Sequence, residues 1–172
     1  MGDVGRGFFV REGIPEFMHD RAVPTADLIA PNRFELEFLT GLPADTLDEA
    51  LAASDRARAL GPDLVLTTSL LLPEHEPEAT IGMLAVSGEG AWLVRTPLLP
   101  LSVNGAGDAT AALFLAHHLR GGDPAKALSK TASSIHAVLE ATLRARSQEI
   151  HLIEAQDDIA EPPDRFPAQR LC

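Results

Sequence analysis

The sequence is poor in cysteine and in positive charge. Its one cysteine, Cys172, excludes a disulfide framework and a thiolate metal cluster. Fourteen Lys and Arg residues stand against 25 Asp and Glu, and the resulting net charge of −11 argues against nucleic acids and anionic membranes as partners. No apolar run approaches membrane-spanning length, and the first ten residues lack the layout of a signal peptide. We therefore expect a cytoplasmic protein, whose charge still permits small anionic ligands.

What the sequence does contain is the composition of an ordinary globular protein. Hydrophobic residues make up 45% of the chain and charged residues 23%. A chain of 172 residues with this balance can bury a core without disulfides or metals. We expect a single domain over residues 1–172.

Apolar runs and turn residues predict alternating strands and helices. Helices are expected over 33–40, from 45 or 46 to 60, and over 105–119, 124–146 and 148–160. Strands are expected over 27–30 and 63–68, and a β-hairpin over 81–86 and 91–95. Loops are expected over 1–21, 70–78, 97–104 and 162–172. This order predicts an α/β fold with a mostly parallel sheet flanked by helices, together with an antiparallel hairpin.

The strongest local signal is Asn104-Gly105-Ala106-Gly107-Asp108 at the start of an apolar helix. The glycines let the backbone approach a ligand closely, and the free N–H groups of the first helical turn suit a phosphate. Asp108 could act as a base that takes a proton from an attacking hydroxyl. The alternative is that its carboxylate only stabilises the positive end of the helix dipole. A dinucleotide fingerprint and a Walker loop both fit poorly, since the third glycine and the Gly-Lys-Ser/Thr step are absent.

A second signal, Pro31-Asn32-Arg33-Phe34-Glu35, directly follows the first expected strand. A carboxylate at this end of a parallel strand can order Mg²⁺ through water, as phosphoryl transfer requires. The same residues also match a capping box, in which Asn32 caps the helix and Glu35 reaches back. Taken alone, the pattern favours the capping box.

Two weaker signals accompany these. Thr67, Thr68 and Ser69 end the second expected strand, where hydroxyls either face the ligand crevice of an α/β protein or simply form a hydrophilic strand end. Asp3, which follows Gly2, is a candidate second carboxylate on the metal side. The six histidines show no metal-ligand spacing, and we expect core or surface positions for them.

The order of these signals resembles the ribokinase superfamily of ATP-dependent small-molecule kinases, and most closely its pyridoxal kinase branch. The stretches that carry the resemblance are MGDVGRGFFV, ADLIAPNRFELEFLTG, GPDLVLTTS, NGAGDATAALFLAHHL and EIHLIEAQDDIAEPPDRF. The last stretch separates the chain from generic sugar kinases. Related hydroxymethylpyrimidine kinases usually carry cysteine where Asp108 stands, which disfavours that branch.

The resemblance implies transfer of the γ-phosphate of MgATP to the 5′-hydroxyl of pyridoxal, pyridoxine or pyridoxamine, a step of vitamin B6 salvage. It implies Asp108 as the catalytic base, next to an anion hole formed by the amides of Gly105, Ala106, Gly107 and Asp108. It implies Glu35 and Asp3 as holders of Mg²⁺ and its waters, with Asn32 in support. For ATP it implies Thr67 at a phosphate with Thr68 beside it, and Leu99 and Val103 around the adenine.

Family members are longer at the N-terminus, so the resemblance implies that this chain is the C-terminal, ATP-binding portion. It also implies an exposed sheet edge and uncovered apolar helix faces. Two other functions stay open: a related kinase of another vitamin or sugar, and a non-catalytic remnant that binds nucleotide or a partner chain. A homodimer is implied, whereas the preferred vitamer and a requirement for K⁺ stay open.

Overall fold

A computed structural model describes residues 1–72 and 80–172 of the chain. Its helices are α1 (Ile14–Phe17), α2 (Arg33–Thr40), α3 (Leu47–Arg58), α4 (Ala106–Gly121), α5 (Pro124–Ala145) and α6 (Gln156–Ala160). Its strands are β1 (Gly2–Asp3), β2 (Gly7–Phe8), β3 (Leu28–Ile29), β4 (Leu64–Leu70), β5 (Thr80–Ser87), β6 (Gly90–Pro97) and β7 (Gln169–Arg170). Within the described residues, no helix is long and apolar enough to cross a membrane.

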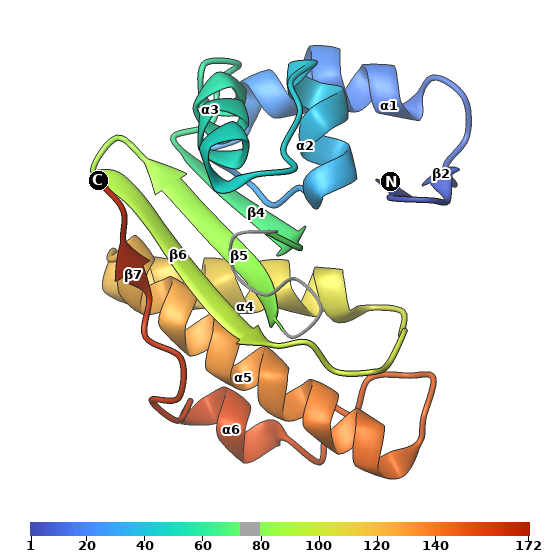
Figure 1. Cartoon of the computed structure of the whole chain (residues 1–172), viewed down its shortest axis with the longest axis vertical. Helices are drawn as coiled ribbons and strands as arrows, with labels where there is room; N and C mark the ends of the chain where they lie inside the picture. Colours follow the sequence, from blue (N-terminus) through green and yellow to red (C-terminus); the bar gives the residue numbers. More distant parts are fainter. Residues whose placement is uncertain (73–79) are drawn as a thin grey trace.

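The centre of the fold is a five-stranded sheet in the order β3-β4-β5-β6-β7, with helices on both faces (Figure 1). Only β3 and β4 run parallel, and the other three neighbouring pairs are antiparallel. The α/β class and the hairpin are confirmed, but the prediction of a mostly parallel sheet is wrong for this chain. The reason is that one strand–helix–strand crossover, from β3 through α2 and α3 to β4, precedes a hairpin and a returning C-terminal strand.

Alternation along the strands divides the core into two layers. Leu64 and Leu66 of β4 face α4 and α5, where they pack with buried side chains such as Phe114. Val65, between them, faces α2 and α3 and packs with alanines such as Ala53. Successive strand side chains point to opposite faces, so a sheet covered on both sides needs apolar residues at nearly every position.

Local signals fix the helix boundaries as expected. Helix α2 begins after Asn32, whose side chain accepts from the Glu35 amide at 2.9 Å, and ends at Gly41 in the left-handed region with φ 69°. Helix α3 begins after Thr46 with a second capping box. Asp123 caps α5, and Pro124 occupies its first position, where a missing N–H costs no hydrogen bond.

The two ends of the chain are more regular than predicted. The first 21 residues, expected to be loop, form the β1–β2 hairpin, α1 and most of a π-helical turn over Met18–Ala22. The expected final helix is confined to α6. In the tail expected to be irregular, β7 pairs with β6, where the Leu171 amide donates to the Ala91 carbonyl at 2.9 Å. Of the loop expected over 70–78, Leu70 belongs to β4, and 73–79 lie outside the described residues.

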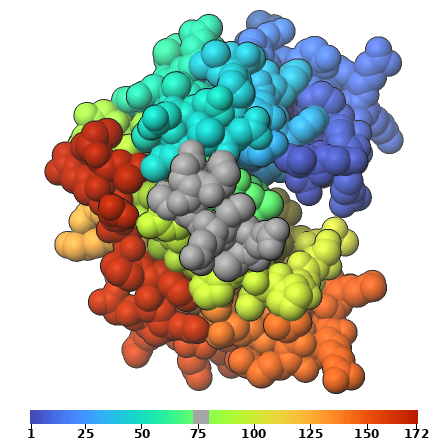
Figure 2. Space-filling view, in the orientation of Figure 1, coloured from blue at the N-terminus to red at the C-terminus, as the bar shows by residue number. Residues whose placement is uncertain are grey.

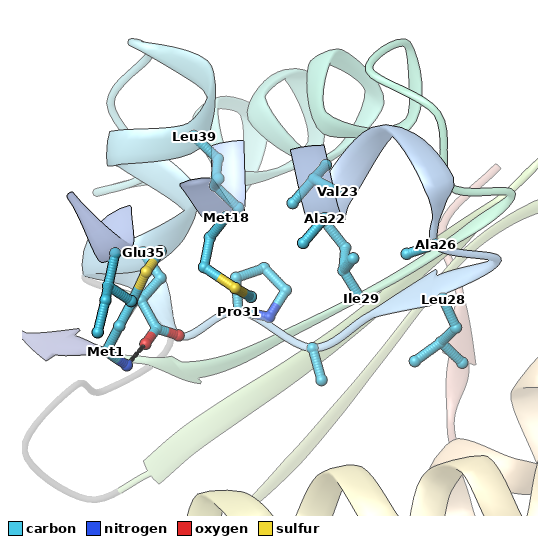
Figure 3. Close-up of a pocket in the computed structure, with 12 residues that line it drawn as sticks. Met1, Met18, Ala22, Val23, Ala26, Leu28, Ile29, Pro31, Glu35 and Leu39 are labelled. Atoms are coloured by element: carbon cyan, nitrogen blue, oxygen red, sulfur yellow. Dashed lines mark hydrogen bonds and ion pairs between the residues drawn. The ribbon is translucent and has the colours of Figure 1, made fainter. Parts of the chain in front are cut away.

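The sheet has the exposed edge that the resemblance implied. In the part of the chain that the structure describes, β3 pairs with β4 on one side only. Beside β3 lies a hollow of 390 Å³, which we call the β3 hollow, with walls that include Met18, Ala22, Ile29 and Leu39 (Figure 3). Uncovered apolar side chains also occur on α4, where Leu119 is 76% exposed.

Candidate active site

Residues far apart in the sequence line one cleft of 520 Å³. Figure 2 shows the surface hollowed between the N-terminal residues, drawn in blue, and the yellow-green segment that leads into α4. Of the residues predicted for the site, the cleft gathers Asp3, Asn32, Glu35, Thr68, Val103, Gly105, Ala106, Gly107 and Asp108. The cleft therefore joins the carboxylates expected on the metal side to the turn expected to hold phosphate.

The turn before α4 is built to leave backbone amides free. Gly105 is the N-cap of the helix in the left-handed region, with φ 87°, a conformation that favours glycine. No side chain of the described residues caps this helix end. A Cβ added at Gly107 would meet no atom within 4 Å, so the space above the first turn is open. The free amides and the positive end of the α4 dipole suit an anion here.

Asp108 lies in the first turn of α4, and its side chain is exposed to the cleft. The C-terminal segment supports this turn from behind. Asn104 forms a bridge with Glu149, and the Ile150 side chain approaches the Cβ position of Gly105 at 3.4 Å. The carboxylate therefore projects from a turn held by packing, beside the free amides.

Glu35 forms the capping box of its motif, and its predicted role beside a metal stays a prediction. One carboxylate oxygen, Oε2, accepts from the Asn32 amide at 3.0 Å, which confirms the capping box. The other oxygen, Oε1, accepts from the Gly2 amide at 3.3 Å and from the amino group of Met1. These contacts fix the carboxylate at the cleft wall, where Oε1 is paired with the Met1 amino group of this chain.

Asp3 reaches the cleft because the β1–β2 hairpin packs on α2. A Cβ at Gly2 would lie 2.3 Å from the Phe34 ring, so only glycine lets the strand sit this close. The Gly2 carbonyl accepts from the Asn32 side-chain amide at 2.8 Å, which ties the hairpin to the α2 cap. Asp3 is exposed, and its Oδ1 accepts from the Val4 amide at 2.7 Å.

These carboxylates suit a magnesium ion that keeps most of its waters. No group of three or more His, Cys, Asp or Glu side chains within residues 1–72 and 80–172 could hold a metal by itself. Magnesium is commonly bound through one or two carboxylates, several waters and the phosphates of a substrate. Asp3 and Glu35 in one cleft provide such a partial donor set.

Thr67 and Leu99 do not line the cleft. The Thr67 side chain is fully buried on the opposite face of the sheet, and its hydroxyl lies 3.0 Å from the Ser54 hydroxyl of α3. A phosphate contact by Thr67 therefore does not fit the structure, because alternation along β4 turns Thr68 rather than Thr67 toward the ligand side. Leu99 is half-buried in the segment before α4 and is not part of the cleft wall, which Val103 reaches instead.

Because Thr67 and Thr68 face opposite sides of the sheet, they give a matched pair of predictions. Thr67→Val removes a buried hydroxyl and leaves Ser54 without its partner, so we expect the free energy of unfolding to fall by about 1–3 kcal/mol while ATP affinity stays unchanged. Thr68→Val, at the half-buried cleft wall, is expected to lower ATP affinity with little effect on stability. Urea unfolding and calorimetry of both variants measure the two effects. An ATP affinity that falls in Thr67→Val alone would contradict this placement.

Sequence reasoning missed Arg6 and left Ser69 without a role. Arg6 lines the cleft and is its only basic side chain among the described residues. A cation between two glycines beside Asp3 is the signal that could have marked it. Ser69 also lines the cleft, and its positive φ of 59°, in an irregular stretch of β4, is rare for a residue other than glycine. Strained residues of this kind concentrate at functional sites.

Comparison with known protein families gives a match for most of the chain that contains this sheet and cleft. The pfkB family of carbohydrate kinases matches residues 14–137, so the chain belongs to this family. The chain is 59% identical over 172 residues to the pyridoxal kinase PdxY of Rubrobacter xylanophilus. It is 49% identical over 171 residues to the enzyme of the same name from Leifsonia xyli.

The relatives are longer than this chain. The matches cover 100% and 99% of the chain but 59% and 60% of the two relatives, so the chain spans about three fifths of their length. Among solved structures, pyridoxal kinase from Leishmania donovani with ADP and ginkgotoxin superposes with a TM-score of 0.89 at 21% identity, over 100% of this chain and 59% of that one. Plasmodium falciparum PdxK with AMP-PNP and PL gives 0.85 at 21% identity, over 100% and 58%. The expected ribokinase-like fold is thereby confirmed.

Proposed function

We propose that this chain supplies the phosphate-binding and proton-accepting part of a kinase that transfers the γ-phosphate of ATP to the 5′-hydroxyl of pyridoxal, pyridoxine or pyridoxamine. The observation that supports it is the meeting of Asp108, the free amides of α4 and the Glu35 carboxylate in one cleft. The names of the relatives support the choice of acceptor.

In this proposal the first turn of α4 holds the transferring phosphoryl group. Its amides donate hydrogen bonds to phosphate oxygens, and the helix dipole favours the negative charge. Asp108 accepts the proton of the acceptor hydroxyl as its oxygen attacks the γ-phosphorus. The bond from that phosphorus to the β,γ-bridging oxygen breaks, and ADP leaves. Because phosphoryl transfer depends on positioning and charge stabilisation, a rigid turn is the feature that matters most.

The remaining cleft residues take supporting roles in the proposal. Glu35 and Asp3 would hold Mg²⁺ and its water shell, and the ion would neutralise phosphate charge. Thr68 and Arg6 line the cleft where a hydroxyl and a cation can contact phosphate oxygens, and Val103 would contact the adenine of ATP. We further propose a cytoplasmic homodimer, with Mg²⁺ as the metal and a K⁺ requirement to be determined.

The family description favours a second candidate, a kinase of a sugar or of another vitamin. A third is a nucleotide-binding remnant without turnover. One experiment separates them: the chain is fused to the part of the R. xylanophilus relative that lies outside the match and is assayed with ATP and either pyridoxal or ribose. We expect phosphorylation of pyridoxal. Preference for ribose in the fusion, where the unfused relative prefers pyridoxal, would favour the sugar kinase, and ATP binding without any transfer would favour the remnant.

Glu35→Gln in this fusion tests the metal side. The variant keeps an oxygen that can accept from the Asn32 amide but loses the charge that orders the ion. We expect the Mg²⁺ concentration for half-maximal activity to rise several-fold while the melting temperature changes by only a few degrees. The control is Glu49→Gln, which alters the capping box of α3 away from the cleft. If Glu35 acts only as a cap, both variants lose a little stability and keep their metal dependence.

A further inference from the structure

Another pocket, distinct from the β3 hollow and the Asp108 cleft, lies at the other end of α4 from Asp108. It has a volume of 150 Å³ and sits between the C-terminal end of α4 and the start of α5. Four basic side chains line it: His117, Arg120, Lys126 and Lys130. Small residues such as Gly121 and Ala127 leave the space between them. None of these residues belongs to the Asp108 cleft.

The side chains at this pocket are mainly positive, whereas the molecule as a whole is negative. The chain carries a net charge of −11 and has only two lysines, and both line this pocket. They lie four residues apart near the start of α5, where like charges repel each other and the positive end of the helix dipole disfavours Lys126 in the first turn. A cluster of like charge that a single carboxylate only partly offsets points to an anionic ligand.

The acidic side chain at the pocket does not balance this charge. Asp123 lies 3.6 Å from the Lys126 ammonium, but its Oδ1 already accepts from the amides of Ala125 and Lys126. Within residues 1–72 and 80–172, Lys130 and Arg120 form no ion pair. Three cations and one carboxylate leave a net charge of +2.

His117 adds a neutral polar group to the pocket. Burial lowers the pKa of its imidazole below the usual range, and the charges of Lys130 and Arg120 lower it further. Its Nε2 atom is buried and has no hydrogen-bond partner among the described residues. A buried polar atom without a partner costs free energy, and the His117 imidazole would have to turn toward the pocket for a ligand to bond to this nitrogen.

We propose that this pocket binds a phosphate dianion, either free or as a small monoester. The dianion matches the net charge of +2, and three long basic side chains together with an imidazole provide charge-assisted donors for its oxygens. A volume of 150 Å³ leaves room for a phosphate group between these side chains. The proposal is independent of the chemistry at Asp108.

The test follows the His117 imidazole by NMR while inorganic phosphate is added to the chain at constant ionic strength, at about pH 8, where phosphate is mainly a dianion. We expect a saturable shift of this resonance and a rise in the pKa of His117, because the dianion favours the imidazolium form. Chloride should produce neither. The amide resonances of Gly105–Asp108 report phosphate binding in the cleft separately. The proposal for this pocket and the proposal for the cleft can therefore be contradicted independently of each other.

Variants complete the test. Lys126→Gln with Lys130→Gln should weaken the response of His117 by about tenfold or more, since each charge-assisted bond is worth about that factor. Arg144→Gln, an exposed change at the far end of α5, should leave it unchanged. Glycerol 2-phosphate, added in place of phosphate, shows whether monoesters enter. An absent response, an equal response to chloride, or a response kept in the double variant would overturn the proposal.

Discussion

Asp108→Asn in the completed fusion is expected to reduce kcat for pyridoxal phosphorylation by about 10²–10⁴-fold, the usual range for removal of a general base. The asparagine has nearly the same shape, so the free amides of the first α4 turn should keep their positions. The affinity for ATP, measured by calorimetry, should therefore change little. The loss should fall on kcat rather than on nucleotide binding.

The matched control for this variant is Asp157→Asn. Asp157 is exposed at the start of α6, and its loss changes the net charge by the same amount without touching the cleft. We expect wild-type turnover from the control. If the turnover of Asp108→Asn stays within a factor of a few of wild type, Asp108 does not accept the proton. Its carboxylate would then only stabilise the N-terminal end of α4.

Phe114→Ala is expected to lower the free energy of unfolding by about 3–5 kcal/mol. Phe114 is the largest fully buried side chain, and it joins α4 to the sheet and to α5. Its ring also stacks on His118, with 6.3 Å between ring centres and 5° between planes. Truncation leaves a cavity in the layer that anchors α4, and the helix cannot collapse into it without moving its own N-terminal turn.

Urea unfolding measures this loss, with Leu119→Ala on the same helix as its control. Leu119 is 76% exposed, so the control should change stability by less than about 1 kcal/mol. A loss in Phe114→Ala no larger than in the control would mean that α4 is held mainly by its loops. Because α4 carries Asp108, reduced activity in Phe114→Ala should accompany the instability and recover on cooling.

The parts of the fold that the sequence predicted are those that local chemistry decides. Asn32, Glu35 and Gly41 define α2 within ten residues, and the structure places both of its ends at the predicted positions. The glycines before Asp108 similarly specify a turn with free amides. The match of four separate motifs to one family then predicted that side chains from residues 3 to 108 share one site. Spacing and periodicity alone could not have predicted this.

The parts that were missed depend on tertiary contacts. The tail residues Gln169 and Arg170 carry no strand signal, and they form β7 because β6 offers an unpaired edge on which Arg170 can lie over the Trp92 ring at 5.9 Å. The choice between Thr67 and Thr68 depends on which face of β4 is covered by α3. Two adjacent threonines by themselves give no indication of that, and it is the contact with Ser54 of α3 that identifies Thr67 as the buried one.

The brevity of β3 has a consequence for how isolated chains behave at high concentration. An open edge of a sheet is a template for aggregation, but β3 offers only Leu28 and Ile29, and Pro31 interrupts the backbone donors soon after. The opposite edge, β7, is equally short. Fibril-like growth through strand addition is therefore disfavoured at both edges. If copies of this chain associate through the apolar walls of the β3 hollow, that association should respond to salt and temperature as a hydrophobic contact does.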